Sequence, residues 1–140
     1  MRKLKKLLVL TLVFSMLLSA IAFASEEIGV KINGEDVVFT DAKPVDKDGV
    51  VFIPLRAVFE ATGAQVFWEG ETQTIISSLG EDKVIMQIAN PVLFINSDTS
   101  YTMDYAPYIE NDRTYIPFNA FSMAFGYNYN ENGNIISFTK

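Results

Sequence analysis

Apolar residues are distributed along the chain in two ways: one long run near the N-terminus, then short patches separated by turn residues. The run 7–18 contains no charged residue and follows residues 2–6, of which four are basic. Ala22 and Ala24 then place small side chains at the two positions that a signal peptidase reads. This three-part pattern predicts a signal peptide over residues 1–24, cleaved after Ala24. A retained membrane anchor is the alternative, since the apolar run approaches the roughly 20 residues that span a bilayer.

Two later segments carry apolar side chains at the spacing of a helix face, each between a proline and a glycine. The first lies between Pro54 and Gly63, and the second between Pro117 and Gly126. Proline suits the first helical position, where an N–H would be unpaired, and glycine tolerates the left-handed position after the last turn. The pattern predicts two short helices of about nine residues. Their apolar positions are Leu55, Val58 and Phe59 in the first, and Phe118, Phe121 and Phe125 in the second.

Strand-like patterns surround both predicted helices. Ala64, Val66 and Trp68 alternate with Gln65, Phe67 and Glu69, as the two faces of a half-buried strand do. Asn33-Gly34 separates apolar patches at 28–32 and 37–39 and predicts a hairpin, because Asn-Gly accepts the positive φ values of a tight turn. Further strands are expected at 50–53, 74–77, 84–89, 92–95, 101–103, 113–116, 127–129 and 135–138.

The two halves of this pattern repeat at an offset of 63 residues. Residues 30–70 align without a gap, and ten of the 41 positions are identical, including both helix-flanking pairs of proline and glycine. We therefore predict two repeats, at about 28–80 and 84–140, in one domain over 25–140. A single repeat would leave strand edges exposed, so the repeats are expected to share one core.

Charge and missing residue types exclude several classes of function. Four of the 11 basic residues and none of the 17 acidic ones lie in residues 1–24, so the remaining chain has a net charge of −10. That charge argues against binding to nucleic acid or anionic lipid. The chain has no His and no Cys, which excludes the usual zinc, copper, haem and iron–sulfur sites and His-dependent nucleophilic catalysis. We expect no cofactor, no metal and no enzymatic activity. After the signal peptide no second long apolar run follows, so no membrane span is expected.

Residues 52–68 and the Asn33-Gly34 hairpin resemble the copper amine oxidase N-terminal-like domain, or stalk domain, family. That family repeats an Asn-Gly hairpin, an Asn-Gly-Arg turn and the motifs Val-Pro-Leu-Arg, Glu-Ala-Leu-Gly-Ala and Val-x-Trp. Matching residues in the first repeat are Pro54, Leu55, Arg56, Glu60, Gly63 and Trp68, and in the second Asn111, Arg113, Pro117 and Gly126. In the second repeat Asn119, Met123 and Glu131 stand where the family has Arg, Glu and Trp.

The resemblance implies an α+β fold in which antiparallel sheet wraps around the helices. It also implies a secreted or surface protein of bacteria. It does not imply amine oxidation, because the family is named after an accessory domain that is remote from the copper site.

Charged residues in the first helix and at two turns are the first candidates for a site. Arg56 and Glu60 are four residues apart and form either a surface ion pair or a tie from the helix to a neighbouring strand. The acidic residues at two equivalent turns are Asp46, Asp48, Glu110 and Asp112. They lack the spacing of a Ca²⁺ loop, which supplies six to eight oxygens, and fit ordinary turns better. No carboxylate pair is distinguished as that of a glycosidase.

Aromatic residues and Met123 supply a second candidate surface. All six tyrosines lie between Tyr101 and Tyr129, and tyrosine is common both at binding surfaces and in strands. Met123 replaces the Glu60 of the first repeat. If Met123 is exposed, a partner or self-association would explain it, whereas a covering sheet would make it core. Residues predicted to bind a partner on this basis are Met123, Tyr115, Tyr127 and Tyr129.

These observations favour a non-catalytic module that is secreted or held in the cell envelope. Such a module would bind a protein or a cell-wall polysaccharide, or act as a structural spacer. The alternative is a small secreted inhibitor or regulator of an enzyme. The two hypotheses differ in the partner they require.

Overall fold

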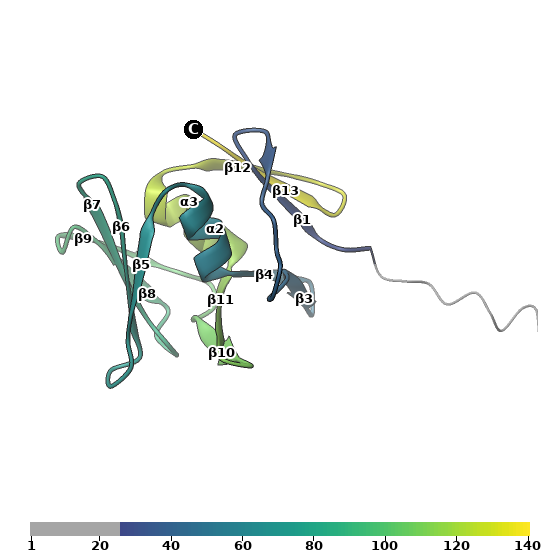
Figure 1. Ribbon diagram of the computed structural model, residues 1–140. Coiled ribbons are helices and arrows are strands. Elements are labelled where there is room, and N and C mark those ends of the chain that lie inside the picture. Colours follow the sequence, from purple (N-terminus) through teal and green to yellow (C-terminus); the bar gives the residue numbers. More distant parts are fainter. Residues whose placement is uncertain (1–25) are drawn as a thin grey trace, which may run out of the picture.

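Two short helices lie at the centre of the molecule, with three sheets around them (Figure 1). The computed structural model describes residues 26–140, so the predicted signal peptide and its cleavage site lie outside the described residues. The helices are α2 (Leu55–Ala61) and α3 (Phe118–Phe125). Neither of these helices is long enough and apolar enough to cross a membrane.

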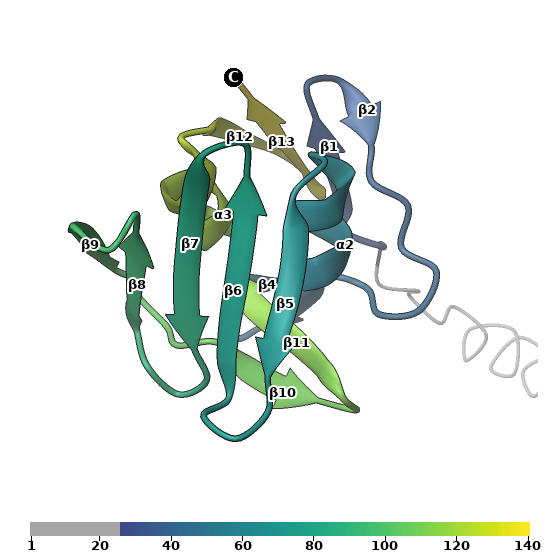
Figure 2. The ribbon, with the colours of Figure 1, turned by 60° about the vertical axis from the view of Figure 1, so that its left-hand side comes forward.

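The largest sheet has five strands in the order β5-β6-β7-β8-β9, and each pair of adjacent strands in it is antiparallel. It faces the viewer in Figure 2, with α2 behind one edge. Its strands are β5 (Gln65–Glu69), β6 (Thr74–Leu79), β7 (Asp82–Gln87), β8 (Val92–Ile95) and β9 (Thr99–Thr102). Buried residues alternate with half-buried ones along β6 and along the middle of β7, because one face covers the helices and the other lies nearer solvent.

Two four-stranded sheets complete the fold, and each combines strands from both halves of the described chain. One has the order β10-β11-β4-β3 and the other β12-β13-β1-β2. Strands of the first are β3 (Val45–Lys47), β4 (Val50–Pro54), β10 (Tyr108–Glu110) and β11 (Arg113–Pro117). Strands of the second are β1 (Gly29–Ile32), β2 (Glu35–Asp36), β12 (Asn128–Asn132) and β13 (Ile135–Thr139).

The predicted α+β class is confirmed in a strand-rich form, but the expected arrangement of antiparallel sheet around the helices is only partly right. The strands form three separate sheets, and β1 pairs with β13 in parallel. Gly29 lies opposite Ile135, and Ile32 opposite Phe138. A parallel pair needs a long connection, and here the rest of the domain supplies it. The pairing joins the two ends of the described chain.

Aromatic side chains from both helices meet in the core. Phe59 of α2 lies 4.9 Å from Phe125 of α3, measured between ring centroids. Phe121 is fully buried and lies 4.6 Å from Phe138 of β13 and 4.9 Å from Tyr127. Edge-to-face and offset contacts of this kind add to the free energy gained from burial of the rings. The core therefore depends on residues from both halves of the chain.

The glycines predicted to end the helices do so, with φ values of +88° at Gly63 and +70° at Gly126. The prolines lie one position earlier than predicted. Pro54 and Pro117 are the last residues of β4 and β11, with extended ψ angles of 116° and 140°, and the helices begin at the next residue. A proline can end a strand and cap a helix at once, because it has no N–H to leave unpaired.

Several strand boundaries differ from those predicted, and those of β2, β7 and β12 are among them. The Asn33-Gly34 turn has φ values of 49° and 85°, as expected for its hairpin, but β2 covers 35–36 rather than 37–39. β1 begins at Gly29, so residues beyond 38 have no partner on it and leave the sheet. β7 ends at Gln87 rather than at Ala89, which turns with a φ of 63°. β12 begins at 128, one residue later than predicted.

Candidate functional site

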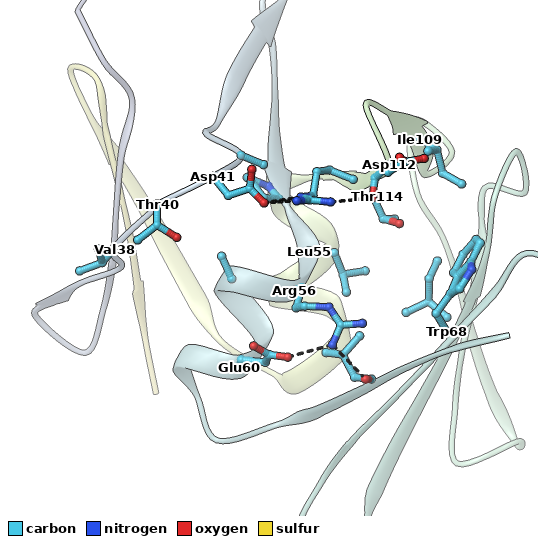
Figure 3. A pocket seen from close by; sticks show the side chains of 16 residues that line it. Val38, Thr40, Asp41, Leu55, Arg56, Glu60, Trp68, Ile109, Asp112 and Thr114 are labelled. Atoms are coloured by element: carbon cyan, nitrogen blue, oxygen red, sulfur yellow. Dashed lines mark hydrogen bonds and ion pairs between the residues drawn. The ribbon is translucent and has the colours of Figure 1, made fainter. Parts of the chain in front are cut away.

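A groove of about 800 Å³ opens beside the first turns of α2. Its walls come from five segments: residues 38–42, α2 with the preceding Pro54, β5, Ile75 of β6, and the β10–β11 turn with its flanking residues (Figure 3). We call it the α2–β5 groove. Its volume lies in the usual range of small-molecule sites, roughly 300–1,000 Å³.

Arg56 holds one side of the groove together. Its Nη1 atom donates to Oε1 of Glu60 at 3.0 Å and to the carbonyl oxygen of Val66 at 3.3 Å. Val66 belongs to β5, which is an edge strand of the five-stranded sheet. The second hydrogen bond favours the interpretation that Arg56 ties its helix to a strand. It also occupies an edge carbonyl that would otherwise be open to pairing.

Arg113 holds the opposite side. Its Nε atom donates to Oδ2 of Asp41 at 2.6 Å, and its Nη2 atom also contacts that carboxylate. Nη1 donates to the carbonyl oxygen of Asp112 at 3.3 Å. Asp41 and Arg113 are 72 residues apart, so this surface pair links the 38–42 segment to the β10–β11 turn.

Apolar side chains form the rest of the lining. Trp68, which is half-buried, and Leu55, which is buried, lie along the groove, while Val38 and Ile109 are 76% and 38% exposed at its rim. Figure 3 shows Trp68 on one side and Asp41 on another, with the Arg56 side chain extending between them. A large aromatic ring beside fixed charged groups is a common composition for a ligand site.

Within residues 26–140, no group of three or more His, Cys, Asp or Glu side chains is placed to hold a metal ion. The carboxylates at the two turns have local roles. Asp46 accepts a hydrogen bond from the Gly49 N–H at 2.8 Å, which closes its turn, and Glu110 lies 4.0 Å from the Lys47 ammonium.

The residues predicted to bind a partner do not form one surface. Tyr115 and Tyr127 are buried, with 8% and 9% of their surface exposed, so they contribute to packing in this conformation. Burial raises the pKa of the Tyr115 hydroxyl above its ordinary value of 10.0, and the nearby Tyr108 adds to the shift. Met123 is half-buried against the core. Tyr129 is 47% exposed and packs edge-on against Phe118 at 5.0 Å.

The groove was not predicted as a site. Arg56, Glu60 and Trp68 were selected from the sequence as a structural motif, and they line one part of it. Asp41 and Arg113 carry a weaker signal, since an identical residue, Asp104, follows Asp41 at the 63-residue offset and Arg113 belongs to the turn that resembles the family motif. Nothing local in the sequence indicates that these five residues meet.

Comparison with known proteins agrees with the resemblance. The family model described as copper amine oxidase N-terminal domain matches residues 31–138, which include all the strands and helices except the first two residues of β1 and the last residue of β13. The domain that defines this family is a non-catalytic N-terminal module, and the comparison with family models matched no catalytic domain in this chain. A search among curated proteins found no match. Because the match extends over most of the chain, the protein belongs to the copper amine oxidase N-terminal domain family.

Proposed function

We propose that this protein is an exported, non-catalytic module of the cell envelope that binds a protein or a polysaccharide there. The observation that carries the proposal is the α2–β5 groove, in which charged side chains are fixed by hydrogen bonds next to an aromatic ring. Fixed polar groups lose little conformational freedom when a ligand binds, so they favour recognition. A spacer without a ligand would not require such a groove.

Export is proposed from the signal peptide pattern in residues 1–24. N-terminal sequencing of the protein recovered outside the cell is expected to begin at Ser25, because Ala22 and Ala24 fit the peptidase positions. Recovery of the protein with Met1 to Ala24 still attached, in the membrane fraction, would instead establish an anchor.

We also propose that the fold is a duplication. The helices, the β3–β4 and β10–β11 hairpins and their turns recur at the 63-residue offset. In the β4–β11 pair Ile53 lies opposite Ile116, its counterpart at that offset, and both side chains are fully buried. A pair centred on equivalent residues is what a pseudo-two-fold axis between two repeats would produce.

The binding partner can be tested with purified residues 25–140 and isolated cell envelopes. We expect the protein to sediment with the insoluble wall, and this retention to survive protease digestion of the wall if the partner is polysaccharide. Retention that is lost on digestion would indicate a protein partner. Failure to sediment in both cases, together with inhibition of a secreted enzyme, would overturn the proposal in favour of the inhibitor function.

A further inference from the structure

We infer that the α2–β5 groove binds an uncharged glycan chain, with a sugar ring lying on the indole of Trp68 and its hydroxyl groups bonded to the two arginine–carboxylate pairs. This inference rests on the proposed binding function and specifies its ligand. Three observations carry it: the balance of charge in the groove, the position of Trp68, and the occupied edge of β5.

Charge favours a neutral ligand. Arg56 is already paired with Glu60, and Arg113 with Asp41, so each pair is neutral overall and attracts an anion only weakly. Asp112 also lines the groove and adds a negative charge. The chain beyond residue 24 carries a net charge of −10, which repels anionic ligands at longer range. Paired carboxylates and guanidiniums still offer acceptors and donors, which hydroxyl groups can use without breaking the pairs.

Trp68 provides a flat apolar surface inside the groove. Its side chain lines the cavity, whereas the neighbouring Phe67 is 62% exposed on the other face of β5. The face of an aromatic ring carries partial negative charge, and a sugar ring presents C–H groups with partial positive charge on its apolar side. Stacking of a sugar on Trp68 would bring its hydroxyl groups toward the charged pairs.

The hydrogen bond from Arg56 to the edge of β5 favours a glycan over an extended peptide. A peptide commonly binds beside an open sheet edge by adding a strand. Here the carbonyl oxygen of Val66 on that edge already accepts a hydrogen bond from Arg56, and α2 lies alongside. Strand addition would have to break this bond, whereas a glycan needs no backbone pairing.

The corresponding region of the second repeat lacks these features and serves as an internal comparison. Asn119, Met123 and Glu131 occupy the positions of Arg56, Glu60 and Trp68 at the 63-residue offset. The nearest aromatic ring in that strand, Tyr129, packs edge-on against Phe118. Binding is therefore expected at one groove for each chain.

Trp68 is the single tryptophan of the chain, so intrinsic fluorescence reports directly on the groove. The native protein should be titrated with the uncharged tetrasaccharides of β-1,4-linked N-acetylglucosamine and of β-1,4-linked glucose. We expect at least one of them to shift the emission and to protect Trp68 from acrylamide quenching. A tetragalacturonate of similar size is expected to bind about tenfold more weakly, because its carboxylates meet a net negative groove.

Calorimetry on two variants locates the site. Trp68→Ala should weaken binding of the tetrasaccharide about tenfold or more, whereas Phe67→Ala, an aromatic change on the opposite face of the same strand, should leave it unchanged. Thermal unfolding of both variants checks that they are folded. If Trp68→Ala does not fold, the site is tested by the native protein alone: a bound tetrasaccharide should protect Trp68 from acrylamide quenching.

Two results would overturn the inference. In one, neither uncharged tetrasaccharide protects Trp68 while an octalysine peptide does, which would make the groove a site for cationic peptides. In the other, the protein still sediments with protease-treated walls after Trp68→Ala, with unchanged affinity. That second result would leave the proposed envelope function intact and place binding on another surface.

Discussion

Replacing Phe121 with alanine is expected to lower the free energy of unfolding by about 3–5 kcal/mol, the range for deletion of a buried phenylalanine. The Phe121 side chain is fully buried and its ring contacts Phe59, Phe125 and Phe138. These neighbours come from α2, α3 and β13 and cannot all move inward to fill the space. A large part of the cavity should therefore remain, and small domains have only about 5–15 kcal/mol of stability in total.

Urea denaturation measures this change, through the transition midpoint at an unchanged slope. The matched control is Phe67→Ala, which removes the same side chain from a position that is 62% exposed. That control should stay within about 0.5 kcal/mol of the native protein. Equal effects of the two substitutions would show that Phe121 is not at the centre of the core.

A fragment comprising residues 26–80 is expected to have no cooperative unfolding transition. In the intact domain β1 pairs with β13, β4 with β11 and β6 with β7, and the fragment lacks all three partners. Its single helix would also lose the contacts of Phe59 with Phe121 and Phe125. What remains is a set of two-stranded hairpins with open edges, which are marginal in water.

Circular dichroism during heating compares this fragment with residues 26–140, which should show one sharp transition. Addition of residues 81–140 is expected to restore the signal, since that fragment supplies the missing strands. A soluble, monomeric 26–80 fragment with its own sharp transition would contradict the shared core.

Local features of the fold could be predicted from the sequence because a few residues determine them. Asn33-Gly34 required positive φ values and formed a turn, and Gly63 and Gly126 ended their helices in the left-handed conformation. The periodicity of apolar residues then identified the buried face of each helix. These signals lie within about ten residues of the structure that they specify.

Long-range features could not be predicted in the same way. The β1–β13 pair joins residues about a hundred positions apart, and neither strand carries a mark of its partner or direction. In the sequence Asp41 and Arg113 are likewise two separate polar residues, and only the folded structure shows that they form an ion pair. Tyr115 and Tyr127 were ambiguous for another reason, since a tyrosine fits both a strand interior and an exposed surface.

The parallel pairing of β1 with β13 has a mechanical consequence. The described chain enters at the Gly29 end of this pair and leaves at the Thr139 end, so the two ends of the domain point in opposite directions along adjacent strands. Tension applied between them would slide one strand along the other and would load the hydrogen bonds of the ladder together. Strands peeled apart from one end break such bonds one after another. The domain is therefore built to resist tension applied between its two ends.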